Sequence, residues 1–162
     1  LERESVAVHR ERIAAVIKDA DAIAIAGGHV ATLLNRMRLF GIADLVDGHV
    51  LFAWSGGAMA ISERVVLFHD SPPQGAGTAE ILDRGLALCP GLVPLPQPET
   101  RLQLDDQERV RVMARRFDPA LCLALPARSR ATWQDGAWSH VNGVVQLKTD
   151  GANAPFAPAG AP

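Results

Sequence analysis

The chain has 162 residues, of which 48% are hydrophobic, and a formal net charge of -2. This size suits one globular domain with a hydrophobic core. The balanced charge excludes the basic surface that nucleic-acid and membrane-surface binders carry, so we expect neither partner. No apolar run is long enough to span a membrane and the charged N-terminus is unlike a signal peptide, so we expect a cytoplasmic protein.

The two cysteines, Cys89 and Cys122, lie among apolar neighbours and have no metal-ligand spacing. They predict buried free thiols rather than a disulfide framework, which fits a reducing compartment. We expect no metal site and no cofactor.

The first third of the chain predicts a helix over residues 5–19 and a short apolar strand over residues 21–26. The strand ends at Gly27-Gly28-His29, and apolar residues at helical spacing then predict a second helix over residues 30–40. Gly41 is expected to end that helix.

The segment Val50–Ile61 is an apolar run that ends at Ser55, followed by two glycines and helix-compatible residues. We expect a strand over residues 48–54, an abrupt turn at Ser55 and a helix, which is the pattern of a nucleophile elbow. Ala53 and Gly57 supply the small side chains that such an elbow needs. In the alternative interpretation the serine only caps the helix, and the glycines only allow close packing.

Alternating strands and helices predict an α/β fold, a three-layer domain with a mostly parallel sheet and helices on both faces. Parallel strands bring both glycine turns to the carboxyl edge of the sheet. The amides of Gly28 and Gly56 can then form an oxyanion hole beside Ser55. The alternative for Gly27-Gly28 is a helix-start turn or a phosphate cradle, although no dinucleotide or Walker pattern is present.

The remaining sequence predicts a strand at Val65–Phe68, a Pro- and Gly-rich loop from His69 to Gly85 that can act as a lid, and a helix over about residues 106–116. Further strands are expected at residues 86–89, 91–95, 120–125, 130–133 and 143–148. Asp105 and Glu108 suggest a capping box, and Asp135-Gly136 suggests a hairpin between Trp133 and Trp138. Residues 151–162 predict a disordered tail, so the domain would cover residues 1–150.

Three segments together resemble a known family: Ala26-Gly27-Gly28-His29, Ala53-Trp54-Ser55-Gly56-Gly57-Ala58 and Gly85-Leu86-Ala87-Leu88-Cys89-Pro90-Gly91. They are similar to motifs of the serine peptidases typified by dipeptidase E and cyanophycinase. This family belongs to the class I glutamine amidotransferase-like superfamily, whose fold is flavodoxin-like. The resemblance implies that Ser55 is the nucleophile, that Gly28 and Gly56 donate to the oxyanion, and that the substrate is a small peptide or amide.

The resemblance also shows departures at the expected general base. His29 replaces an asparagine and Gly56 an alanine, but Gln97 stands where the family has its histidine. Glutamine cannot take a proton near neutral pH. His69, beside Asp70, is the best substitute base, whereas His29 and Gln97 are expected to contact substrate. No acidic residue occurs near Ala124–Ala127, where the third triad member would lie. Glu63 and Glu80 are expected to face solvent, whereas Glu99 lies closer to the expected site, although a carboxylate alone is a poor base for a serine hydroxyl.

Two hypotheses follow. The chain is either a serine-type peptidase or amidohydrolase that acts through Ser55, or a catalytically lapsed relative that binds a small molecule or peptide, or assists assembly. A cysteine-dependent amidotransferase is disfavoured because serine occupies the elbow. The family fold opens with further strands, so we expect a truncated member, or a homodimer in which a second chain covers the exposed edge.

Overall fold

The computed structural model describes residues 2–68 and 79–158 of the chain, and side chains from residue 4 onward. It is a mixed α/β protein. The helices are α1 (Glu2–Lys18), α2 (Val30–Leu39), α3 (Ile42–Leu45), α4 (Gly56–Ala60), α5 (Pro98–Arg101) and α6 (Gln107–Phe117). The strands are β1 (Ala22–Ile25), β2 (Val50–Ala53), β3 (Arg64–Leu67), β4 (Glu80–Arg84), β5 (Leu92–Pro96), β6 (Leu121–Leu125), β7 (Arg130–Gln134), β8 (Ala137–Asn142), β9 (Val145–Leu147) and β10 (Asn153–Pro155).

The strands form one four-stranded sheet and three two-stranded pairs within the described ranges. The four-stranded sheet has the order β10-β9-β6-β5, and the pairs are β1-β2, β3-β4 and β7-β8. Parallel pairing occurs between β1 and β2 and between β5 and β6, whereas the other described pairs are antiparallel. The mixed α/β character agrees with the sequence prediction, but the described sheets are less parallel than expected.

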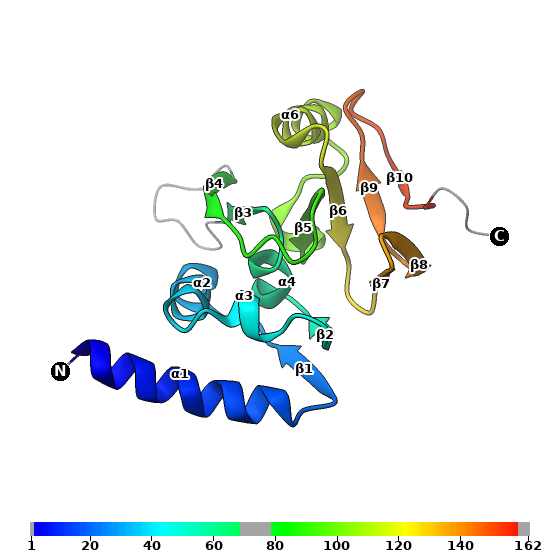
Figure 1. Cartoon of the computed structure of the whole chain (residues 1–162). Coiled ribbons are helices and arrows are strands. Elements are labelled where there is room, and N and C mark those ends of the chain that lie inside the picture. The colour runs from blue at the N-terminus through cyan, green and yellow to red at the C-terminus, as the bar shows by residue number, and fades with distance from the viewer. Residues whose placement is uncertain (1, 69–78, 159–162) are drawn as a thin grey trace.

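The short helix α4 lies between the two parallel strand pairs, where it contacts α2, β3 and β5 (Figure 1). All five residues of α4 are buried. Gly57 allows this position, because a Cβ there would lie 2.1 Å from the carbonyl oxygen of Ile25 on β1. The predicted demand for a small residue two positions after Ser55 is therefore confirmed.

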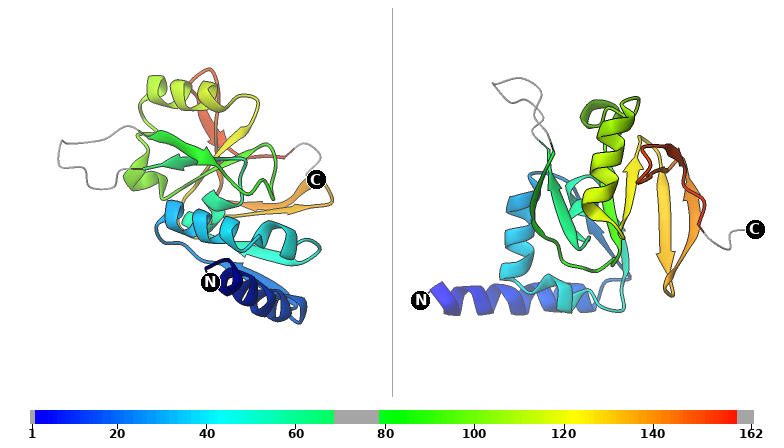
Figure 2. Two further views of the ribbon diagram at one scale, coloured as in Figure 1. Left: turned by 60° about the vertical axis from the view of Figure 1, so that its left-hand side comes forward. Right: turned by 90° about the horizontal axis from the view of Figure 1, so that it is seen from above.

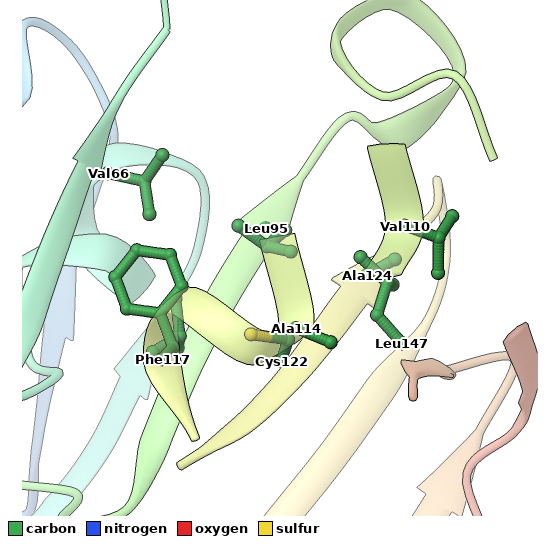
Figure 3. Packing of buried hydrophobic residues seen from close by; sticks show 9 residues of the cluster. Val66, Leu95, Val110, Ala114, Phe117, Cys122, Ala124 and Leu147 are labelled. Carbon is green, nitrogen blue, oxygen red and sulfur yellow. The ribbon is translucent and has the colours of Figure 1, made fainter. Parts of the chain in front are cut away.

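The largest hydrophobic cluster lies between α6 and strands β5 and β6. It includes Leu95 and Ala124, both 0% exposed, and Phe117 at the end of α6. Phe117 extends toward Val66 of β3, so this cluster joins the four-stranded sheet to the β3-β4 pair (Figure 3).

Helix α1 is mostly exposed and lies at the end of the molecule opposite β9 and β10 (Figure 2). Arg10 holds it to the α2–α3 turn, because its Nε donates to the carbonyl oxygen of Phe40 at 3.1 Å and a terminal nitrogen lies 3.6 Å from Asp44. Within the described ranges, no helix has both the length and the apolar composition needed to cross a membrane.

The structure corrects the predictions for the segment between β3 and β5. Residues 80–84 of the predicted loop form β4, which pairs with β3; the rest of that loop, residues 69–78, lies outside the described residues. Residues 86–89 are not a strand. Their backbone amides instead bond to the C-terminal end of α4, with Leu86 N 2.8 Å from Ala60 O and Cys89 N 3.1 Å from Ile61 O.

Two further corrections concern a helix cap and the C-terminal segment. The N-cap of α6 is Asp106, whose carboxylate accepts from the amides of Glu108 and Arg109, so the predicted cap at Asp105 is one residue early. Residues 153–155 of the predicted disordered tail form β10, and Phe156 after them is buried. The hairpin prediction is confirmed, since Trp133 pairs with Trp138 across β7 and β8.

We expect Phe156→Ala to lower the free energy of unfolding by about 3–5 kcal/mol, because it empties a buried site against Trp138. The control is Leu39→Ala, since Leu39 on α2 is 56% exposed and its truncation should change the unfolding free energy by only about 0.5 kcal/mol. Urea unfolding of the two variants makes the comparison. Equal effects would contradict the packing of the C-terminal segment.

We expect Gly57→Ala to destabilise the protein by more than about 2 kcal/mol, because the new methyl group meets the backbone of β1. Gly48→Ala is the control. Apart from its two chain neighbours no residue has an atom within 4 Å of the added Cβ, and its φ of +77° adds only the strain of a left-handed residue, about 1 kcal/mol. Thermal unfolding of both variants measures the difference. A Gly57→Ala protein as stable as the control would show that α4 is less closely packed.

Candidate active site

The parallel register of β1 and β2 places two sharp turns side by side. Ile25 pairs with Ala53 at the carboxyl ends of the strands, so Gly27 and Ser55 leave the sheet together. A Cβ on Gly27 would lie 2.7 Å from the Cβ of Ser55 and 2.8 Å from its Oγ. The two turns are therefore in direct contact, as the sequence predicts.

Ser55 has the strained backbone expected of a nucleophile elbow. Its φ of 53° and ψ of -128° lie in a region that residues other than glycine rarely adopt. Ser55 occupies the N-cap position of α4, yet its side chain makes no capping hydrogen bond. The strain and the uncapped hydroxyl both argue against the interpretation of Ser55 as a simple helix cap.

The two predicted oxyanion donors come from backbones that touch each other. Gly28 has a φ of 126°, which strongly favours glycine, and an added Cβ on Gly56 would lie 2.8 Å from Gly28 O and 3.4 Å from Gly28 N. The alanine that the resemblance leads one to expect at position 56 would therefore clash. The arrangement brings both amide nitrogens close to Ser55, and their role as oxyanion donors remains a prediction.

A small cavity of about 110 Å³ contains this arrangement. The cavity, which we call the Ser55 pocket, is lined by Gly28, His29, Val30, Ser55, Gly56, Met59, Leu67, Phe68 and Arg101. The structure thus brings together four of the predicted site residues, namely Ser55, Gly28, Gly56 and His29.

His29 is better suited to donating a hydrogen bond than to accepting a proton. It caps α2, and its Nδ1 accepts from the amide of Thr32 at a long 3.4 Å. Because Nδ1 presents its lone pair to that amide, the neutral ring carries its proton on Nε2. His29 therefore fits the predicted role of a substrate contact.

The general base is not found among residues 2–68 and 79–158, where no hydrogen bond joins a histidine to Ser55. His69 lies outside the described residues. Gln97 follows β5 in a left-handed conformation, with φ 57° and ψ 51°, and its carbonyl oxygen accepts from the amide of Arg101 at 3.2 Å. It is exposed and does not line the Ser55 pocket, so its predicted contact with substrate remains a prediction.

Arg101 is the charged lining residue that the sequence analysis missed. Its guanidinium carbon lies 5.2 Å from the centre of the Phe68 ring, and both side chains line the Ser55 pocket. Its position could have indicated this role. Arg101 comes four residues, about one helical turn, after Gln97, and Gln97 was already expected to lie near the site. Arg101 gives the pocket a cationic group.

The carboxylates that were weighed as site residues lie elsewhere. Glu63 is exposed and accepts from the amide of Gly91 at 3.3 Å. Glu80 belongs to β4 and Glu99 to α5, both exposed. These three side chains do not line the Ser55 pocket.

The cysteines are free and buried, as predicted. Burial raises the pKa of the Cys89 thiol to about 11 and that of Cys122 to about 12. Both therefore stay protonated at neutral pH and are poor nucleophiles. In the described part of the chain, no three His, Cys, Asp or Glu side chains are arranged to hold a metal ion.

The sequence matches no model of a known protein family. It is similar to Peptidase E of Actinobacillus pleuropneumoniae serotype 5b (strain L20), serotype 3 (strain JL03) and serotype 7 (strain AP76). Each relative is 35% identical over 78 residues, an alignment that covers 44% of this chain and 33% of the relative. The matched region thus spans about a third of the relatives' length, and the likeness supports a peptidase E-like family.

Proposed function

We propose that this chain carries the nucleophile elbow of a serine-type peptidase or amidohydrolase, and that Ser55 attacks a peptide or amide bond of a small substrate. The observation that carries the proposal is the strained backbone of Ser55 in direct contact with the Gly27-Gly28 turn. A residue held in such a conformation costs of order 1–3 kcal/mol, and strain of this kind gathers at active sites. The likeness to Peptidase E supports the same function.

The proposed fold is the three-layer, flavodoxin-like arrangement of the class I glutamine amidotransferase-like superfamily. The parallel β1-β2 and β5-β6 pairs and the buried α4 between them support it. In this fold the site lies at the carboxyl edge of the parallel strands, where the Ser55 pocket lies.

The proposed reaction passes through an acyl-enzyme. The Ser55 hydroxyl oxygen attacks the substrate carbonyl carbon while a base takes its proton, and the oxyanion receives hydrogen bonds from the Gly28 and Gly56 amides. The proton passes to the leaving amine as the carbon–nitrogen bond breaks. Water then hydrolyses the ester, which frees the acid and restores Ser55.

The base in this proposal is His69. It directly follows Phe68, a residue that lines the Ser55 pocket. His29 lies in the pocket but presents a donor, so we assign it to holding the substrate.

A second candidate is a relative that binds a small molecule or peptide but has lost hydrolysis. Gln97 favours it, because glutamine stands at the position where the resemblance places the catalytic histidine. The pocket, its amides and Arg101 would serve equally well for binding.

The compartment and the partners of the protein are also proposals. The two free thiols fit a reducing cytoplasm. Val50, Phe52 and Trp54 of the β2 segment are more than half exposed, which supports a homodimer. We propose neither a cofactor nor a nucleic-acid or membrane partner, since the sequence gives no signal for them.

We expect Ser55→Ala to reduce the hydrolysis of small peptides by at least about 100-fold, because it removes the nucleophile. Amino acids released from a dipeptide mixture, quantified by mass spectrometry, give the rate. Ser5→Ala on exposed α1 is the matched control and should keep the full rate. Turnover that survives Ser55→Ala contradicts the proposal, and the absence of turnover in the unaltered protein favours the binding candidate.

If the second candidate holds and no base serves Ser55, we expect Gln97→His to raise peptide hydrolysis by about 10²–10⁴-fold, because it restores a general base at the position where the resemblance places one. The gain should appear as pH rises through about 6.5, where a free imidazole loses its proton and can accept the Ser55 proton. Gln134→His on the exposed strand β7 is the control. An unchanged rate over pH 5–8 would show that position 97 does not serve Ser55.

A further inference from the structure

A cavity with a volume of about 230 Å³ lies against α6, and we call it the α6 cavity. It is separate from the Ser55 pocket, because the two cavities share a single lining residue, Arg101. An apolar cavity of about 150 Å³ is large enough to take up benzene. The α6 cavity therefore has room for an aromatic ring that carries a short side chain.

The floor of the α6 cavity is apolar. Val110 of α6 and Leu147 of β9, which are 2% and 4% exposed, line it and belong to the largest hydrophobic cluster (Figure 3). Leu102, Leu104 and Met113 continue the apolar lining and are only partly buried. A ligand that covers these side chains removes apolar surface from water, which favours binding.

One face of α6 forms a wall of the α6 cavity. Arg109, Val112, Met113 and Arg116 all line the cavity, and their spacing of i, i+3, i+4 and i+7 places them on the same side of the helix. Two apolar side chains thus lie between two arginines along this wall. Met113 is flexible and can adapt to the shape of a ligand.

Most charged side chains that line the α6 cavity already have partners. Arg109 lies 3.4 Å from the carboxylate of Asp106, and Glu108 lies 2.7 Å from the guanidinium group of Arg111. Arg101 has interactions of its own. These three lining side chains are therefore not assigned to a ligand.

Arg116 differs from them because its partner is uncharged. Its Nη1 donates to the carbonyl oxygen of Ala79 at 2.9 Å, and among the residues that the structure describes it forms no ion pair. The hydrogen bond holds the guanidinium group beside Ala79, which also lines the cavity, and leaves further N–H donors for a ligand. Glu80 and Asp105 neighbour lining residues in the sequence but do not line the cavity. The α6 cavity thus combines an apolar floor with one available cation.

We propose that the α6 cavity binds a small apolar carboxylic acid as its anion, with the carboxylate at Arg116 and a phenyl-sized apolar group against Val110, Met113 and Leu147. A carboxylate matches a guanidinium group because the two form charge-assisted hydrogen bonds, often in pairs. The site does not involve Ser55, so the proposal goes beyond the proposed function.

Calorimetry with the full chain and 3-phenylpropionate tests the proposal. We expect 3-phenylpropionate to bind at least about tenfold more tightly than 3-phenylpropanamide, which lacks the negative charge, and than acetate, which lacks the ring. Equal affinity of the acid and either of the other two probes, or no binding of 3-phenylpropionate, would overturn the proposal.

Two adjacent arginines provide a matched pair of variants. Arg116→Gln removes the proposed partner of the carboxylate, and Arg115→Gln removes the same charge one residue earlier. Arg115 also donates to a backbone carbonyl oxygen, that of Thr149 at 3.0 Å, but it does not line the α6 cavity. We expect Arg116→Gln to weaken 3-phenylpropionate binding at least about tenfold, and Arg115→Gln to change it less than about twofold. Unchanged binding in Arg116→Gln, or an equal loss in Arg115→Gln, would overturn the assignment.

A pair of valine variants tests the position of the ligand. Val112 lines the α6 cavity and is 47% exposed. In Val112→Asp the new carboxylate lies one helical turn before Arg116, where it competes with the carboxylate of the ligand. Val8→Asp makes the same change on α1, where the valine is 43% exposed. We expect a loss of at least about tenfold in affinity for Val112→Asp only; unchanged binding in Val112→Asp would contradict the proposed position.

Ser55→Ala distinguishes the two cavities. We expect this variant to bind 3-phenylpropionate with unchanged affinity, because Ser55 lines the Ser55 pocket and not the α6 cavity. Loss of binding would place the ligand at Ser55 and would overturn the proposal. Neither result depends on whether the protein hydrolyses peptides.

Discussion

The close contact between two backbone turns governs this structure. The Gly27-Gly28 turn after β1 lies directly against Ser55 and Gly56 after β2, with no room for side-chain carbons at Gly27, Gly56 or Gly57. The parallel pairing of β1 with β2 produces the contact, because it carries both turns to the same edge. The buried helix α4 then keeps the two turns in contact.

The contact also explains the backbone strain at Ser55. A serine free to relax would leave its unfavourable φ, but the turn on one side and α4 on the other hold it in place. The C-terminal end of α4 is itself fixed, since the backbone after β4 donates to Ala60 and Ile61. Backbone contacts on both sides thus hold Ser55 in place, and its hydroxyl makes no capping hydrogen bond to α4.

Arg101 links this local geometry to its surroundings. It comes from α5, a single turn after the proline-containing strand β5, and its guanidinium group lies over the ring of Phe68, which also lines the Ser55 pocket. The site is therefore built from two halves of the chain. The first half of the chain supplies the hydroxyl and the amides, while α5 in the second half supplies the positive charge of Arg101.

Local patterns in the sequence predicted the features that depend on near neighbours. The strand, serine and glycine order at residues 50–61 was sufficient to predict the elbow, since small residues are needed wherever a strand and a helix nearly collide. Features set by distant contacts were missed. Residues 86–89 look like a strand, but the end of α4 satisfies their backbone, and Phe156 is ordered by Trp138 and its neighbours despite a loop-like composition. Arg101 was missed because only the folded chain places it over the ring of Phe68, which follows β3.

The central claim is that Ser55 is a chemically activated nucleophile, and a fluorophosphonate probe tests it most directly. Intact-mass analysis after incubation should show one adduct on the unaltered protein and none on Ser55→Ala. That result would show that the strained elbow and its neighbouring amides make the hydroxyl reactive. A folded protein that forms no adduct, or an adduct that persists in Ser55→Ala, would contradict the claim.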